Sequence, residues 1–315
     1  MYLGENNDSK FGGDMKNREL RASILLLLTA AIWGFAFVAQ RIGMEYIGPF
    51  TFNSIRFALG SISLLPVIYF LGNGKNKVRT NEESNKKLLL YGVLAGTVLF
   101  TAATLQQVGL KYTTAGNAGF ITSLYIVIVP LIGLFLRQKS NVYIWTGAIV
   151  AAIGLYFLSI TSDFVIQFGD LLQLIGAFFW ASHIIIIGYF VKNANPIKLS
   201  SIQFAMCSIL SLIAALITET IEISGILSAG IPILYGGLMS VGVAYTLQVV
   251  AQKDAKPSHA AIALSMEAVF AAIGGIILLG ESMSLRGYFG AVLMLIGMLL
   301  SQGETIVNRR KRSIN

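Results

Sequence analysis

Long apolar stretches recur along this chain from Leu20 to Gly303, separated by short polar breaks. An α-helix needs about twenty apolar residues to cross the hydrocarbon core of a bilayer. Inside that core each segment must satisfy its own backbone hydrogen bonds, so each stretch predicts a spanning helix. The pattern predicts ten helices, at residues 22–41, 50–72, 88–109, 115–136, 142–161, 169–191, 199–218, 230–251, 257–280 and 285–303.

The breaks between these stretches carry residues typical of turns. Gly48 and Pro49 separate the first two, Gly72 opens the longest polar loop, and Pro257 stands where the ninth begins. Proline is tolerated in the first turn of a helix, where its missing N–H leaves no intrahelical bond unmade.

Composition agrees with a membrane protein. Of the 315 residues 55% are hydrophobic and 12% are charged, whereas soluble domains carry about 25% charged residues. Cys207 is the only cysteine, which excludes an intrachain disulfide. Two histidines far apart in sequence make no zinc site, and no phosphate-binding loop, nucleophile–base pair or cleavable signal peptide is visible. The sequence therefore predicts an all-α integral membrane protein that needs no cofactor or metal.

The net charge of +8 is unevenly placed. When the predicted loops are assigned to alternate sides, 19 of the 23 Lys and Arg residues fall on the side that holds both termini. The positive-inside rule makes that side cytoplasmic. Orientation and contact with anionic membrane lipids account for the basic charge, and binding to nucleic acid is not expected.

The two halves of the chain resemble each other. Thr104-Leu105-Gln106 recurs as Thr246-Leu247-Gln248, and the same interval pairs Ser123 with Ser265. When one residue is added to the interval for a gap in a loop, glycines of the fifth helix also pair with glycines of the tenth. Trp33 pairs with Trp180 at a slightly longer interval. An odd number of helices per repeat inverts the second copy in the membrane, and inverted repeats recur in secondary transporters that work by alternating access. We therefore expect a tail at 1–20, five-helix repeats at 21–161 and 162–303, and a basic tail at 304–315.

Several segments also resemble a known family, the EamA-type ten-helix permeases of the drug/metabolite transporter superfamily. These segments are 31–34 (Ala-Ile-Trp-Gly), 106–118, 169–170 (Gly-Asp), 266–270 (Met-Glu-Ala-Val-Phe) and 280–281 (Gly-Glu). The resemblance implies a small-molecule carrier of a bacterial cytoplasmic membrane. Such permeases often have proline where this chain has Ala268, which predicts a less kinked ninth helix.

Glu267 is the one acidic residue placed deep in a predicted helix. An ionisable group at that depth is costly, and its default interpretation is functional. Because desolvation disfavours its charged form, it is a candidate to bind a proton or a cationic group, which would allow proton coupling. The alternative is a structural carboxyl, hydrogen-bonded to another helix and constant in its state.

Further candidates lie on other helices. Trp180 and His183 share a face of the sixth helix, where Trp33 is expected to join them by pseudo-symmetry and a substrate would stack on the indoles. Polar side chains that either line a path or join helices are Thr104, Gln106, Gln107, Tyr245 and Gln248. Asn117 is a candidate gate or cap. Arg56 either snorkels to the interface or attracts an anionic group.

The function predicted from these features is secondary transport of a small metabolite, an amino acid or related compound, with export inferred from the resemblance alone. Efflux of amphiphilic cations is an alternative that uses Glu267 and the tryptophans together. A membrane-embedded enzyme and a non-transporting receptor are alternatives of other classes. Small-residue pairs such as Gly92/Gly96 and Ala271/Gly275 are compatible with contacts within one chain or in a homodimer.

Overall fold

The computed structural model describes residues 5–72, 82–113, 115–137, 141–159, 168–279, 283–301 and 303, and within them the chain forms helices and short connections without strands. The helices of the first half are α1 (Glu5–Gly43), α2 (Pro49–Gly72), α3 (Glu82–Gly109), α4 (Ala115–Ser123), α5 (Tyr125–Phe135) and α6 (Val142–Ser159). Those of the second half are α7 (Phe168–Phe190), α8 (Pro196–Thr218), α9 (Ile223–Ser228), α10 (Gly230–Leu234), the π-helix η1 (Tyr235–Tyr245), α11 (Thr246–Ala251), α12 (Pro257–Leu264), α13 (Glu267–Leu279) and α14 (Leu285–Ser301).

Ten apolar helical segments make up the bundle. Among the described residues eight are long and apolar enough to span a membrane, and two shorter apolar helices, Val142–Leu158 and Leu285–Ser301, stand beside them. They correspond to the ten predicted spans. Helix α1 extends beyond its predicted start, back to Glu5. The basic tail at 304–315 and the Gly-Glu pair at 280–281 lie outside the described residues.

Two predicted helices are interrupted in the structure. The fourth breaks at Leu124 between α4 and α5, and the ninth breaks at Ser265 and Met266 between α12 and α13. The ninth is broken although Ala268 stands where proline was expected, because Ser265 turns its hydroxyl back onto the carbonyl of Ile262, 2.9 Å away, and the next amides bond three residues back. The interval of 142 residues found in the sequence maps Leu124 onto Met266, so the two breaks are equivalent in the two halves.

The eighth span contains the π-helix η1, and π-helical turns are frequently found at functional sites. Its carbonyl groups are partly held by side chains of α1. The Thr29 hydroxyl donates to the carbonyl of Ala244 at 3.1 Å, and the Trp33 indole donates to that of Ser240 at 3.3 Å. These two side-chain hydrogen bonds therefore join η1 to α1.

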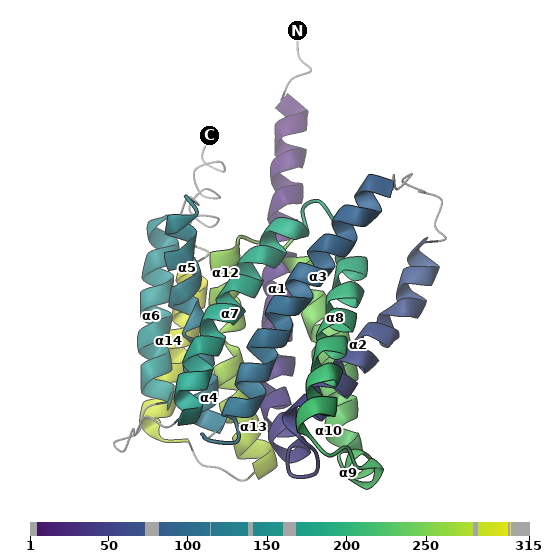
Figure 1. The fold of residues 1–315 in the computed structure, drawn as a ribbon. Coiled ribbons are helices and arrows are strands. Elements are labelled where there is room, and N and C mark those ends of the chain that lie inside the picture. The colour runs from purple at the N-terminus through teal and green to yellow at the C-terminus, as the bar shows by residue number, and fades with distance from the viewer. Residues whose placement is uncertain are drawn as a thin grey trace.

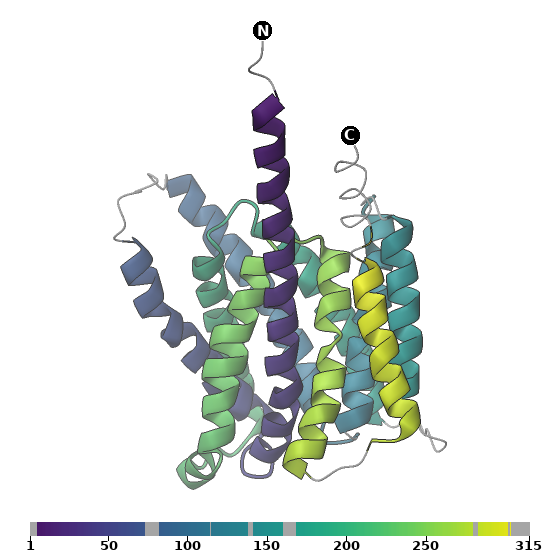
Figure 2. The ribbon, with the colours of Figure 1, turned by 180° about the vertical axis from the view of Figure 1, so that it is seen from behind.

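Helix contacts recur in corresponding pairs. The third span packs on the sixth, and the equivalent contact in the other half is that of the eighth span with the first. In the same way, the contact of the second span with the eighth corresponds to that of the seventh with the third. The contact of the first span with the ninth corresponds to that of the sixth with the fourth. Helix α1 begins at the end of the bundle where α14 finishes, while α7 begins at the opposite end (Figures 1 and 2). These observations support the predicted inverted repeat.

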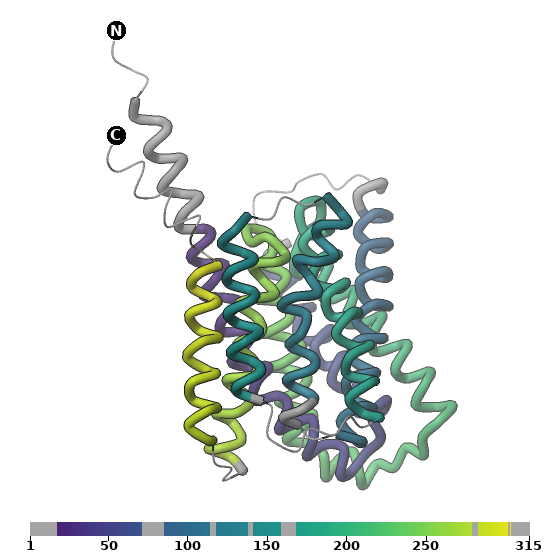
Figure 3. Tube along the Cα trace, turned by 90° about the vertical axis from the view of Figure 1, so that its left-hand side faces the viewer, coloured from purple at the N-terminus to yellow at the C-terminus, as the bar shows by residue number. Residues whose placement is uncertain are grey.

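The fifth and tenth spans, α6 and α14, lie side by side at one edge of the molecule (Figure 3). Glycines bring their backbones together: a Cβ at Gly154 would lie 2.6 Å from the carbonyl oxygen of Gly290, and one at Gly297 would lie 2.6 Å from that of Gly147. Small residues allow such close approach between membrane helices. The repeat pairs Gly147 with Gly290 and Gly154 with Gly297, so the contacts of Gly154 with Gly290 and of Gly147 with Gly297 are equivalent to each other.

Candidate functional site

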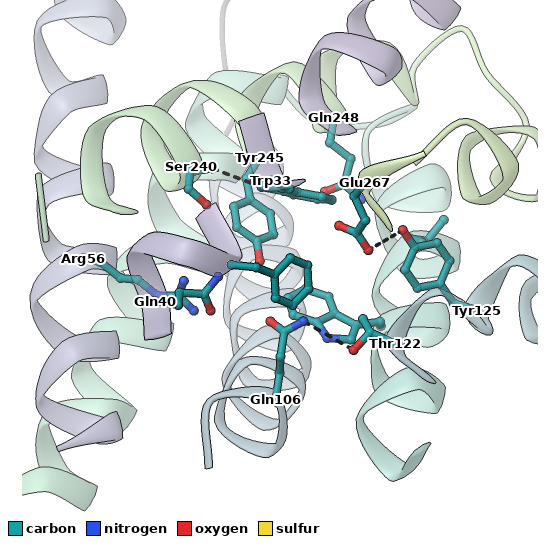
Figure 4. Close-up of a pocket in the computed structure, with 13 residues that line it drawn as sticks. Trp33, Gln40, Arg56, Gln106, Thr122, Tyr125, Ser240, Tyr245, Gln248 and Glu267 are labelled. Carbon is teal, nitrogen blue, oxygen red and sulfur yellow. Dashed lines mark hydrogen bonds between the residues drawn. The ribbon is translucent and has the colours of Figure 1, made fainter. Parts of the chain in front are cut away.

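A buried cavity lies where the two halves meet, and both halves line it. Figure 4 shows the side chains that surround it. The first half contributes Trp33, Phe37, Gln40, Arg56, Gln106, Thr122 and Tyr125, and the second contributes Trp180, Ile184, Ser240, Tyr245, Gln248 and Glu267. Seven of the predicted site residues are among them: Trp33, Arg56, Gln106, Trp180, Tyr245, Gln248 and Glu267.

Glu267 opens α13, directly after the break in the ninth span, and its side chain is buried. The Tyr125 hydroxyl donates to its Oε1 at 2.8 Å (Figure 4). Amides in the first turn of a helix lack intrahelical partners and favour negative charge nearby. The broken helix therefore places a carboxyl group at the cavity with one hydrogen-bond donor and a helix N-terminus beside it.

Tyr125 and Glu267 are equivalent residues of the two halves, because the interval of 142 residues maps one onto the other. Each follows the break in its span. The hydrogen bond between them therefore joins the fourth and ninth spans at the point where both helices are interrupted.

Three aromatic rings form one wall. The ring centroids of Trp33 and Tyr245 are 4.5 Å apart, those of Trp180 and Tyr245 are 6.1 Å apart, and those of the two tryptophans are 6.5 Å apart. These separations are typical of interacting aromatic pairs. The two tryptophans are brought together across the halves, as the sequence predicted, and their faces offer a stacking surface.

Two glutamines from equivalent positions complete the polar lining. The Gln106 amide lies 3.5 Å from the Thr122 hydroxyl, and its backbone carbonyl accepts from Gln173 at 2.9 Å. The Gln248 amide donates to Gln252 at 3.0 Å, while Gln248 Oε1 has no partner among the described residues. The Gln106 side chain thus joins α3 to α4, the Gln248 side chain bonds along the end of its own helix, and both line the cavity.

Arg56 is 1% exposed, inside the bundle and on the cavity wall. This position excludes the snorkelling interpretation, which needs the guanidinium at the membrane surface. Its Cζ lies 4.9 Å from the ring centroid of Phe57 and 5.6 Å from that of Phe52. Its Nε and Nη2 have no hydrogen-bond partner among the described residues.

The remaining predicted residues do not line the cavity. His183 is buried behind Trp180, with its Nε2 2.9 Å from Gln203 Oε1. Gln107 reaches the backbone carbonyl of Gln40 at 3.5 Å, and the Thr104 hydroxyl is buried without a described partner. The side chain of Asn117 lies outside the described residues.

Sequence reasoning missed several lining residues: Phe37, Gln40, Thr122, Tyr125, Ile184 and Ser240. Tyr125 was detectable, because applying the repeat interval to Glu267 leads directly to it. The others carry no signal in the local pattern, since one neutral or apolar side chain on a membrane helix resembles many others. In the described part of the chain no group of three or more His, Cys, Asp or Glu side chains is close enough together to hold a metal ion.

Comparison with known proteins gives consistent results. The model of the EamA-like transporter family matches twice, over residues 20–160 and 167–302. An "uncharacterized transporter" of Archaeoglobus fulgidus is 35% identical over 92% of this chain and 88% of its own length. The uncharacterized transporter YoaV of Bacillus subtilis is 23% identical, over 88% of this chain and 94% of its own length.

A solved crystal structure has the same fold, with a TM-score of 0.71 and 16% identity over 92% of this chain and 98% of that one. Together with the apolar bundle, the matched relatives make this protein a multi-pass membrane transporter and not an enzyme. Both halves of the chain match the same family model, and the chain belongs to the EamA-like transporter family.

Proposed function

We propose that this protein is a secondary transporter that carries a small metabolite, an amino acid or related compound, across the cytoplasmic membrane by alternating access. The observation that carries the proposal is the cavity itself, which is lined by equivalent residues of both halves. In transporters built from inverted repeats the substrate lies between the repeats, near discontinuous helices. Here too the cavity lies beside helix breaks, because Tyr125 and Glu267, which line it, directly follow the breaks in the fourth and ninth spans.

Glu267 is the group we assign to proton or ammonium binding. It is the one acidic side chain in the lining, and only the Tyr125 hydroxyl holds it among the described residues. Substrate and proton binding at a single carboxyl group would link transport to a proton gradient. Export remains the direction that family resemblance suggests, with both termini in the cytoplasm.

Efflux of amphiphilic cations is the second candidate. The tryptophan faces beside Glu267 favour it, since cations bind over indole rings. Arg56 opposes it, because a second cation in the same cavity would be repelled. The two candidates therefore differ in the charge of the substrate.

Solute flux into liposomes tests the proposal. The purified protein is reconstituted, and uptake of radiolabelled amino acids, amines, sugars and lipophilic cations is measured with and without a pH gradient. We expect saturable flux of an amino acid, reduced at least tenfold in Glu267→Gln. The matched control is Asp254→Asn, which removes an exposed carboxyl group away from the cavity.

Absence of flux for every solute would contradict transport by this chain. Flux that Glu267→Gln leaves unchanged, with the same pH dependence, would remove the proton role. Flux restricted to lipophilic cations would favour the second candidate.

A further inference from the structure

We propose that Glu219 is a latch that holds the outer ends of α2 and α8 together and releases them when the transporter opens to the outside. The outer end is the end of the bundle at which α9 lies, according to the predicted orientation (Figure 1). This inference rests on the proposed function, because it adds a gating residue to alternating access. Neither the sequence pattern nor the comparisons assign a role to Glu219, which does not line the cavity.

The repeat relates the two helices that Glu219 joins. The interval of 147 residues from Trp33 to Trp180 also pairs Pro49 with Pro196, the first residues of α2 and α8. The N-termini of α2 and α8 are therefore equivalent. Because the second half is inverted, the N-terminus of α2 lies at the outer end of the bundle and that of α8 at the inner end.

The start of α8 has a local cap. Asn195 precedes the helix, and its side-chain oxygen accepts from the amides of Ile197 and Lys198, at 3.0 and 3.1 Å. Asparagine is among the preferred residues at this position, because its side chain reaches the first amides of the helix. The cap and the amides belong to the same turn, so this cap persists wherever α8 moves.

The start of α2 is capped from another helix instead. The repeat maps Asn195 onto Gly48, which has no side chain to accept a hydrogen bond. The equivalent amides, those of Phe50 and Thr51, donate to the carboxylate of Glu219 at 2.9 and 2.8 Å, and the Thr51 hydroxyl donates to it at 2.7 Å. Glu219 follows the last residue of α8. The cap of α2 therefore exists only while the two helix ends are together.

The inner ends of the same helices differ from the outer ends. The repeat maps Glu219 onto Gly72, the last residue of α2, and glycine has no group that could cap α8. Figures 1 and 2 show the end of α2 standing apart from the start of α8. The structure therefore has the outer ends of the pair joined and the inner ends apart.

The pair formed by α2 and α8 lies on the pseudo-twofold axis of the molecule. The Ser61 hydroxyl donates to the carbonyl of Ser201 at 2.9 Å, and that of Ser208 donates to the carbonyl of Ser54 at 2.8 Å. The repeat turns one of these bonds into the other, and it exchanges the outer end of the pair with the inner end. When the two halves exchange their conformations, as in alternating access by inverted repeats, the outer ends separate and the inner ends join.

The apolar packing beside these ends is compatible with such a movement. At the outer end Phe52 of α2 shares a buried cluster with Ile233 of α10. At the inner end the equivalent residues, Leu199 of α8 and Tyr91 of α3, also share a cluster, although the end of α2 stands apart there. This packing thus forms in both arrangements, whereas the hydrogen bonds of Glu219 break when α8 leaves α2.

The latch biases the conformational equilibrium. Hydrogen bonds to a carboxylate are stronger than those between neutral groups, and the amides at a helix N-terminus favour negative charge. All three hydrogen bonds of Glu219 act at the outer end, and the inner end has no counterpart. The protein without substrate should therefore favour the state that is closed to the outside.

Distances between spin labels test the latch in the full-length protein in lipid nanodiscs, with Cys207→Ser as the background. The pair Glu45→Cys and Ile217→Cys reports the outer ends. The equivalent pair, Lys192→Cys and Phe70→Cys, reports the inner ends, and all four positions are exposed. We expect a shorter distance for the outer pair than for the inner pair when Glu219 is present.

Removal of the carboxylate should reverse this difference. In Glu219→Ala we expect the ratio of separated to joined outer ends to rise about tenfold or more, and the inner pair to shorten to the same extent. Glu219→Gln keeps one acceptor oxygen and should shift both pairs in the same directions by less, which also serves if Glu219→Ala does not fold. Glu222→Ala, which removes an exposed carboxyl group nearby, is the control and should keep the wild-type distances.

A local cap distinguishes a latch from a purely structural cap. Gly48→Asn combined with Glu219→Ala gives α2 the residue type that caps α8, and it removes the carboxyl group with which a Cβ at Gly48 would collide. We expect this double variant to regain melting temperature relative to Glu219→Ala while its outer ends stay apart. Return of the outer ends to the wild-type distance would show that any cap suffices and would overturn the latch.

The proposal also fails if Glu219→Ala and Glu219→Gln keep the wild-type distances, or if the outer pair lengthens while the inner pair stays unchanged. Liposome flux separates this failure from failure of the proposed function. Wild-type flux together with unchanged distances in both variants would leave transport standing and refute the latch. The expected changes of distance in a protein that moves no solute would support the latch and refute transport.

Discussion

At the scale of single residues, the Tyr125 hydroxyl is the hydrogen-bond donor that the described structure gives to the Glu267 side chain. The carboxyl group is buried, so loss of this donor leaves an acceptor oxygen without a partner away from water. Hydrogen bonds to charged groups contribute about 1.5–3 kcal/mol, and unsatisfied buried groups cost a similar amount. Tyr125 therefore acts on Glu267 and, through it, on the cavity.

Replacing Tyr125 with phenylalanine tests this contact. We expect Tyr125→Phe to lower the free energy of unfolding by about 1.5–3 kcal/mol, the contribution of a hydrogen bond to a carboxylate. Thermal denaturation in detergent measures the change. Tyr189→Phe, which removes an exposed hydroxyl, is the control and should melt with the wild type. Equal melting of the two variants would mean that the Tyr125 hydroxyl contributes nothing to stability.

At the scale of helices, a carboxylate from the second half caps the N-terminus of a helix in the first half. Glu219 follows α8 and accepts from the first amides of α2, from Phe50 N at 2.9 Å and Thr51 N at 2.8 Å, and from the Thr51 hydroxyl at 2.7 Å. Amides at a helix start lack intrahelical partners and are stabilised by such an acceptor. Gly48 leaves room for it, since a Cβ there would lie 2.2 Å from the Glu219 carboxyl carbon.

Removal of this cap should loosen the contact between α2 and α8. We expect Glu219→Ala to destabilise the protein by about 1–2 kcal/mol, and Glu219→Gln by less because its amide keeps one acceptor oxygen. The melting temperature in detergent is the measurement, with Glu222→Ala, an exposed carboxyl group nearby, as the control. Glu219→Ala that melts like Glu222→Ala would show that water replaces the cap without cost.

The packing of α6 on α14 is the second feature at this scale, because two pairs of glycines bring backbone against backbone. A methyl group at Gly297 would lie 2.6 Å from the Gly147 carbonyl oxygen and force the helices apart. Overpacking of this kind typically costs about 1–3 kcal/mol. We expect Gly297→Ala to lower the melting temperature measurably. Gly119→Ala is the matched control, since a Cβ there has no neighbour within 4 Å, and equal losses in both variants would contradict the packing explanation.

At the scale of the whole molecule, the start of α1 and the end of α14 share one end of the bundle, and α9 lies at the other (Figure 1). The distribution of Lys and Arg predicts that the first of these ends is cytoplasmic. The bundle then places Lys192, which follows α7, inside the cell and Glu222, which precedes α9, outside.

Labelling of single cysteines tests this orientation. Cys207 is the only native cysteine and is buried, so Cys207→Ser provides the background. In intact cells we expect a membrane-impermeant maleimide to label Glu222→Cys and to label Lys192→Cys only after the cells are broken open. The opposite pattern would place both termini outside.

The sequence predicts some features of the structure well and others not at all. Hydropathy alone placed the ten spans within a few residues, because the bilayer sets a minimum apolar length that can be read locally. The breaks in the fourth and ninth spans were missed, since Leu124 and Met266 are apolar like their neighbours. Their interruption depends on turn hydrogen bonds and packing that hydropathy does not record.

The sequence by itself determined the all-helical membrane fold, the likeness of the two halves and the depth of Glu267, because length, order and hydropathy are properties of the chain. Only the tertiary structure decided that Arg56 is buried at the cavity, that His183 lies behind Trp180 and not in the cavity wall, and that the Tyr125 hydroxyl donates a hydrogen bond to Glu267. The reason is physical. Which face of a helix meets the cavity depends on how that helix rotates and packs against helices far away in sequence, and a helix that is apolar all round gives no local sign of it.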